Sequence, residues 1–247
     1  MRLSRHLSRI LRDPQGKRTN GVILFEDQYR VAIATGLRKE SDNEKTGRMV
    51  QVWILARDAS PLDAVATGAD ALVCGGCALR GILGKKRPCY VELGKAPSRV
   101  WDAYKRGRYA RLPLADTLAL LTGRAVRFGA YGDPAFLPFT LLRAIADVAS
   151  TWTGYTHQWR AWWAAAYSAL LMASADNAQD AQVARAAGWR TFGLADAPGA
   201  GEVACPFSER GTQCADCSLC SGASIGAKSI TIPPHGPGAQ YAQVATS

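Results

Sequence analysis

Four of the seven cysteines of the chain lie within sixteen residues near its C-terminal end. Cys205, Cys214, Cys217 and Cys220 have the spacing C-P-x7-C-x2-C-x2-C. A close C-x2-C-x2-C loop can ligate three irons of a cubane while a more distant Cys-Pro cysteine ligates the fourth, as in bacterial ferredoxins. Zinc sites usually combine two separated pairs of ligands, and redox dithiols use a single C-x2-C. We therefore expect a [4Fe–4S] cluster here, with zinc and a redox dithiol as the alternatives.

The other three cysteines, Cys74, Cys77 and Cys89, have the spacing C-x2-C-x11-C. Three thiolates leave one corner of a metal centre to water, substrate or another ligand, for which His235 is a candidate. The basic residues 85–87 could offset the charge of a cluster or bind an anionic substrate. We expect a second, open [4Fe–4S] cluster at these cysteines. One metal with ligands from both groups is the alternative.

The odd number and tight grouping of the cysteines argue against a secreted disulfide framework. The N-terminus lacks the continuous apolar region and small-residue cleavage site of a signal peptide. No uncharged apolar run approaches the length of a membrane span. These features predict a cytoplasmic protein without a membrane span.

The net charge of +10 is unevenly distributed along the chain. Residues 1–111 hold 22 Lys and Arg against 11 Asp and Glu, whereas the remainder holds 8 against 9. Such a basic half could bind nucleic acid, although no recognition motif accompanies it. Solubility and compensation of an anionic cluster are the alternative explanations for this charge.

Apolar runs of strand length alternate with helical patterns through most of the chain, which is typical of βαβ units and a parallel sheet. The expected strands are residues 51–56, 71–74, 125–131, 152–157, 170–176, 189–195, 202–206 and 229–236. The fold class is therefore predicted to be α/β, a complete or partial parallel β/α barrel (TIM-barrel-like) with a cysteine-rich C-terminal segment. An open doubly wound sheet is the alternative, but no Gly-x-Gly-x-x-Gly or Walker sequence supports a nucleotide fold.

Three regions are expected along the chain. Residues 1–45 form a basic N-terminal arm, with a short amphipathic helix, followed by a β-hairpin at 21–37. Residues 46–236 form the barrel-like domain that carries both cysteine groups, and 237–247 form a tail.

Polar residues fall at or just after the ends of the expected strands. They include Asp133, His157 and Asp176. Sites in α/β sheets are built at this edge, so these three are the catalytic candidates. His157 could act as a general acid or base, or as a metal ligand. Asp133 and Asp176 could instead cap the elements that follow them.

Several motifs together resemble an uncharacterised family of cysteine-rich proteins of tailed bacteriophages and some bacterial genomes. The motifs are "GADALVCGGC", "RFGAYGDPAFLP", "TGYTHQW", "MASAD", "CPFSERGTQCADCSLCSG" and "IPPHG", and the resemblance covers about residues 46–236. The family implies no established reaction, and it places a phage-encoded protein in the host cytoplasm. The predicted architecture also resembles the radical S-adenosylmethionine superfamily, but the C-x3-C-x2-C spacing of those enzymes is absent.

The function expected from these features is redox or radical-type catalysis by an iron–sulfur protein on an unknown small-molecule or anionic substrate, with an external electron donor. The missing spacing argues against S-adenosylmethionine as a cofactor. The alternative is a nucleic-acid-binding phage protein stabilised by zinc or a cluster, without catalysis.

Overall fold

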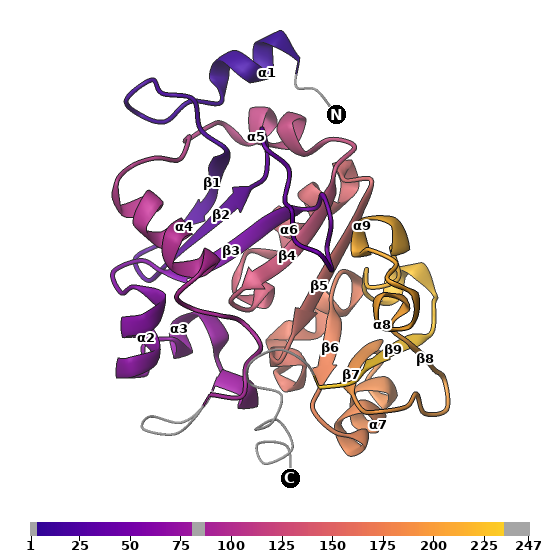
Figure 1. Cartoon of the computed structure of the whole chain (residues 1–247). Coiled ribbons are helices and arrows are strands. Elements are labelled where there is room, and N and C mark those ends of the chain that lie inside the picture. The colour runs from indigo at the N-terminus through magenta and orange to yellow at the C-terminus, as the bar shows by residue number, and fades with distance from the viewer. Residues whose placement is uncertain (1–3, 81–86, 235–247) are drawn as a thin grey trace.

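Nine strands form one mixed sheet in the order β1-β2-β3-β4-β5-β6-β7-β9-β8 (Figure 1). This computed structural model describes residues 4–80 and 87–234. Strand β2 pairs antiparallel with β1 and with β3, and the pairing is parallel from β3 to β8. The strands are β1 Gly21–Glu26, β2 Arg30–Thr35, β3 Val50–Ala56, β4 Ala125–Tyr131, β5 Thr151–Thr156, β6 Met172–Ala175, β7 Thr191–Leu194, β8 Glu202–Ala204 and β9 Ser229–Ile232.

The sheet is open over the described residues, with β1 and β8 at its two edges. The predicted α/β class is confirmed. The prediction allowed a complete or a partial barrel, and the sheet does not close into a complete one. The predicted N-terminal hairpin is formed by β1 and β2, and it extends the sheet beside β3.

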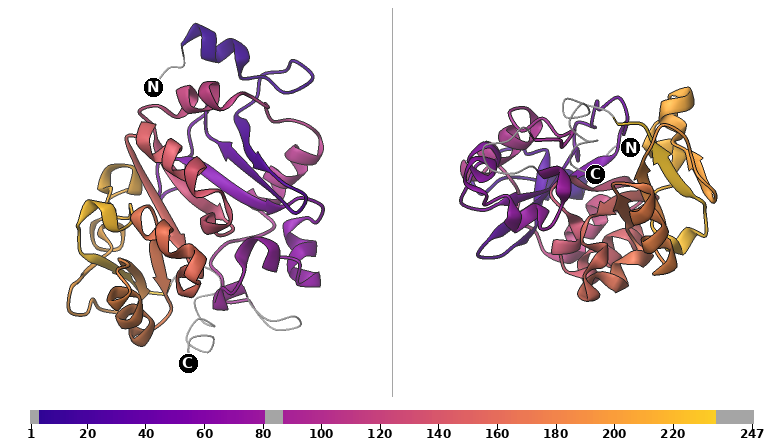
Figure 2. Two further views of the ribbon diagram at one scale, coloured as in Figure 1. Left: turned by 180° about the vertical axis from the view of Figure 1, so that it is seen from behind. Right: turned by 90° about the horizontal axis from the view of Figure 1, so that it is seen from below.

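The helical segments are α1 Arg5–Ile10, α2 Pro61–Thr67, α3 Ala71–Cys74, η1 Ala78–Arg80, α4 Ala96–Lys105, α5 Leu114–Leu121, η2 Pro134–Phe136, α6 Phe139–Val148, η3 Gln158–Arg160, η4 Trp162–Ala169, α7 Ala178–Ala186, α8 Pro206–Arg210, α9 Cys214–Cys217 and η5 Ala223–Ile225. Helix α6 and its neighbours cover the face of the sheet that is seen from behind in Figure 2. On the other face, the connection between β2 and β3 crosses in front of β4, with α3 and α4 to one side and α8 and α9 to the other (Figure 1). No helix among the described residues is long and apolar enough to cross a membrane.

Local sequence explains why several helices begin where they do. The Ser60 side chain accepts a hydrogen bond from Asp63 N, with Pro61 in the first turn of α2 and left-handed Gly68 at its end. The Asn177 side chain caps α7 in the same way. Strand β3 is buried along almost its whole length, as expected of a central strand.

One predicted strand is wrong. Residues 71–74, "ALVC", form the short helix α3, in which Cys74 N donates to Asp70 O at 2.8 Å. A four-residue apolar run has no periodicity that separates strand from helix, and here Val73 packs into the core from a helix. Cys74 therefore lies at a helix end and not at a strand end.

Candidate functional site

Cys74, Cys77 and Cys89 line one cavity of about 80 Å³. Cys74 ends α3, Cys77 lies before η1, and Cys89 N donates to Leu79 O at 2.9 Å. The opposite wall comes from residues at or after the ends of β4, β5 and β6, among them Asp133 and His157. The three cysteines, Asp133 and His157 therefore line one cavity, whereas Asp176 reaches it only through its contact with His157.

The surroundings of Cys74 and Cys89 favour the neutral thiol at these two positions unless a cation is present. Burial raises the pKa of Cys74 well above its usual value, and nearby Cys77, Cys89 and Asp70 raise it further. Burial also raises the pKa of Cys89, which Arg87 and a backbone hydrogen bond from Val91 oppose. A bound metal reverses this preference because coordination deprotonates a thiol.

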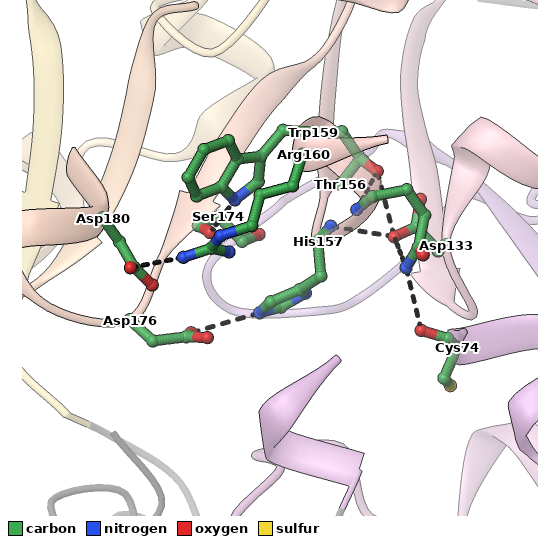
Figure 3. A network of polar contacts seen from close by, with 10 residues as sticks. Cys74, Asp133, Thr156, His157, Trp159, Arg160, Ser174, Asp176 and Asp180 are labelled. Carbon is green, nitrogen blue, oxygen red and sulfur yellow. Dashed lines mark hydrogen bonds and ion pairs between the residues drawn. The ribbon is translucent and has the colours of Figure 1, made fainter. Parts of the chain in front are cut away.

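Asp133 organises the wall of the cavity and is not a free base (Figure 3). Its Oδ2 atom accepts hydrogen bonds from Thr156 Oγ1 at 3.0 Å, His157 N at 2.9 Å and Gln158 Nε2 at 3.2 Å. Its Oδ1 atom accepts from Ala135 N at 3.0 Å. Burial raises its pKa, and these hydrogen bonds oppose that rise. The capping role considered for Asp133 is confirmed, and its larger effect is to position His157.

The same network joins the end of β5 to the end of α3. Gln158 Nε2 also donates to Cys74 O at 3.1 Å. Gly132, immediately before Asp133, has φ +78°, and a Cβ there would lie 2.4 Å from Ile54 O. Only glycine fits this turn without displacing β3, so the Gly-Asp-Pro sequence fixes where the Asp133 carboxylate lies.

His157 lies between a carboxylate and a thiol. Its Nε2 atom is 3.2 Å from Asp176 Oδ1 (Figure 3). Burial alone would lower the pKa of His157, but Cys77 and Asp176 outweigh burial and raise it well above the usual value. Asp176 does not cap the helix that follows it, because Asn177 is the N-cap of α7. Asp176 is therefore available to orient the imidazole of His157.

The four C-terminal cysteines line a second, smaller cavity of about 10 Å³. Cys205 follows β8, Cys214 and Cys217 are the first and last residues of α9, and Cys220 follows a left-handed turn at Ser218. Backbone bonds anchor three of them, because Cys205 N donates to Thr231 O, Cys214 N to Lys45 O, and Gly154 N to Cys220 O. The spacing predicted one site for these four residues, and the structure brings all of them to one cavity.

Lys45 is one of the cations near these four thiols. It lines the same cavity, and its ammonium lies 5.7 Å from the centre of the Phe192 ring. Burial lowers the pKa of Lys45, while Cys205, Cys214 and Cys220 oppose this lowering. Burial raises the pKa of Cys214, and Lys45 and Arg127 lower it. Sequence reasoning missed Lys45 because its loop is charged throughout and gives no local signal.

Tyr155 separates the two cysteine cavities and lines both of them. Its ring lies 4.5 Å from that of Phe192, measured between centroids. Burial raises the pKa of Cys220 to about 12, and a hydrogen bond with Tyr155 opposes this. Tyr155 was not predicted as a site residue, although its position two residues before His157 on β5 could have indicated it.

His235, predicted as a metal ligand, lies outside the described residues. Within residues 4–80 and 87–234, no group of three or more His, Cys, Asp or Glu side chains is arranged to hold a metal ion. Comparison of the chain with protein-family models, curated proteins and solved structures gives no match.

Proposed function

We propose that the chain is an iron–sulfur protein in which Cys205, Cys214, Cys217 and Cys220 hold a closed [4Fe–4S] cluster. The observation that carries the proposal is the gathering of these four cysteines, from segments on both sides of α8, around one cavity. Cys205 and Cys220 are buried, and Cys214 and Cys217 are partly buried. This setting, together with the nearby cations Lys45 and Arg127, suits a group with a net negative charge.

The spacing of the four cysteines favours a cluster over a single zinc ion. Zinc draws its ligands to about 2.3 Å from one point, so the ligands must converge closely. The cysteines around a cubane each bind a different iron and stand further apart. The close C-x2-C-x2-C loop with a more distant Cys-Pro cysteine is the pattern of a cubane, and zinc stays the alternative.

Cys74, Cys77 and Cys89 would hold a second cluster with one open iron. That cluster would supply electrons to a substrate, with an electron-donor protein as the external source. His157, oriented by Asp176, faces the same cavity and would hold or deliver a proton there. The class of reaction we propose is redox or radical-type catalysis, and the spacing of these three cysteines gives no support to S-adenosylmethionine as its cofactor.

The sheet would then act as an open segment of a β/α barrel. The consecutive order of β3 to β7 and the position of Asp133, His157 and Asp176 after three neighbouring strands support this description. In such a segment, the residues that follow adjacent parallel strands meet at one edge and share one site.

Anaerobic purification followed by absorbance and electron paramagnetic resonance spectroscopy tests the proposal. We expect brown protein that absorbs at about 400 nm and bleaches in air. Cys217→Ala should lose one paramagnetic signal and Cys74→Ala the other. Ser221→Ala is a matched control, because Ser221 is buried beside Cys220 and donates to Trp152 O at 2.7 Å without lining the cavity. If Ser221→Ala loses as much colour as Cys217→Ala, the loss in Cys217→Ala reflects a general disturbance of this segment and not the removal of a ligand.

A second function is favoured by the position of His157 between Cys77 and Asp176. A thiol, an imidazole and a carboxylate in this order are the parts of a nucleophilic cysteine site. Under this alternative Cys77 carries no metal and is alkylated by iodoacetamide in protein as purified. If Cys77 resists alkylation as purified and becomes alkylated only after iron is removed, this alternative is excluded.

Nucleic-acid binding through residues 1–111 stays a prediction. Several arginines of this region bind acidic side chains of the same protein, namely Arg57 and Arg111 with Glu26, Arg80 with Asp70, and Arg108 with Asp13. If the region binds DNA or RNA, the affinity should fall steeply as the salt concentration rises.

A further inference from the structure

A third cavity, of about 500 Å³, lies next to the three-cysteine site. Its floor is formed by residues of β2, β3 and β4, and its walls by the loop after β2 and by residues 90–97. Tyr90 and Val91 line both this cavity and the three-cysteine cavity. The volume is within the range of small-molecule sites, which is about 300 to 1,000 Å³.

The polar groups on the floor of this cavity differ in whether they have partners. Gln51 and Arg127 are paired across β3 and β4. Gln51 Nε2 donates to Thr46 Oγ1 at 3.0 Å, and Trp53 Nε1 donates to Thr35 Oγ1 at 2.8 Å. The side chain of Arg127 has no hydrogen bond or ion pair with any residue in the described ranges, although it is only partly exposed.

The other charges of the lining do not compensate Arg127. Glu92 pairs with Lys95 at 2.6 Å between Oε2 and Nζ. Lys39, Glu40 and Asp42 are exposed on the loop at the rim, where water screens them. Arg127 influences Cys214 only through its charge, which lowers the pKa of that thiol. A partly buried guanidinium with five donors and no acceptor therefore points into a cavity that can hold a ligand.

We propose that this cavity binds a small, ring-bearing anion whose phosphate or carboxylate group is held by Arg127. Two donors of a guanidinium match two oxygens of either group. Trp53 and Tyr90 line the cavity and provide aromatic surface for the ring. No cysteine lines this cavity, so binding of the anion can be measured whether or not the cysteines hold metal. Its role as substrate rests on the proposed function, because the ligand would meet the three-cysteine cavity at Tyr90 and Val91.

Calorimetric titration of the protein as purified tests this inference, with AMP as the phosphate probe and 4-hydroxybenzoate as the carboxylate probe. We expect one of the two to bind and so to identify the anionic group. Adenosine or phenol, which keep the ring without the anion, should bind at least about tenfold more weakly. Failure of both anions to bind would overturn the proposal.

Arg127→Gln should weaken binding of whichever anion binds by about tenfold or more. Lys39→Gln, at the exposed rim, is the control and should weaken it by less than about threefold. Arg127→Lys keeps the charge and tests the same point if the Gln variant does not fold, and it should weaken binding because it loses the bidentate contact. Unchanged affinity in a folded Arg127 variant would contradict the inference. Iron content measured on the same samples separates this result from a failure of the iron–sulfur proposal.

Discussion

The imidazole Nε2 of His157 lies 3.2 Å from Oδ1 of Asp176, and the two residues follow neighbouring parallel strands, β5 and β6. The Asp133 carboxylate, which follows β4, holds the backbone N–H of His157 from the other side. Three adjacent strand ends thus orient one histidine toward Cys77. This arrangement supports the proposal that His157 holds or delivers a proton at the three-cysteine cavity.

Asp176→Asn should lower the pKa of His157 toward its usual value, because Asp176 and Cys77 raise that pKa against the effect of burial. The chain has only three histidines, so nuclear magnetic resonance of the imidazoles of metal-free protein can follow this one. Asp180→Asn is the control, because Asp180 pairs with Arg160 and not with His157 (Figure 3). An equal shift in both variants would show that Asp176 does not act on the imidazole directly.

Asp133→Asn should destabilise the fold by about 2 to 3 kcal/mol, because the new amide N–H group would face donors inside the protein. Three donors meet Oδ2 at 2.9 to 3.2 Å in a buried position. Urea unfolding measures the change. Asp102→Asn, at an exposed position of α4, should leave the midpoint within error. A stable Asp133→Asn variant would mean that the network rearranges around the amide.

Lys45→Met should lower the reduction potential of the four-cysteine centre, because loss of a nearby positive charge disfavours addition of an electron. We expect a change of about 40 mV, roughly 1 kcal/mol for a one-electron couple. A redox titration followed by electron paramagnetic resonance measures it. Lys105→Met is the control, because Lys105 packs on Trp101, pairs with Asp58 and does not line the four-cysteine cavity. An unchanged potential in Lys45→Met would remove Lys45 as a counter-charge.

Glu26 gives the fold a pH dependence that is independent of the cysteines. Burial alone would raise its pKa, but hydrogen bonds from Tyr104 and Arg111 and the charge of Arg57 outweigh burial and lower it. A lowered folded-state pKa stabilises the protein above the ordinary pKa of Glu, and this stability is lost as the pH falls through the folded-state value.

Glu26→Gln should therefore cost about 1 kcal/mol at pH 7. The difference from the wild type should disappear in acid, once Glu26 is protonated in both states. Urea unfolding at several pH values measures it. A difference that stays constant down to pH values below the folded pKa would indicate a packing effect and not a charge effect.

The alternation of apolar strands and helices was sufficient to predict the parallel part of the sheet, because each strand from β3 to β7 carries its own pattern. The same alternation placed Asp133, His157 and Asp176 at one edge, where the structure brings them together. It could not predict that α3 is helical, since a run of four apolar residues has no period.

Contacts between segments that are distant in the sequence could not be predicted. The loop that carries Lys45 meets the cysteine-rich segment through Cys214 N and Lys45 O at 2.9 Å, and Arg48 binds Asp216 at 2.8 Å. These contacts join residues separated by more than 160 positions, and no local pattern records them. Closure of the sheet depends on which strands are neighbours, and the periodicity of the sequence does not determine that order.

Quantitation of iron, acid-labile sulfide and zinc in protein purified without air tests the central claim most directly. The proposal predicts about eight iron and eight sulfide per chain if both centres are filled, and about four of each if only the four-cysteine centre survives purification. Colourless protein with stoichiometric zinc and no sulfide would contradict it.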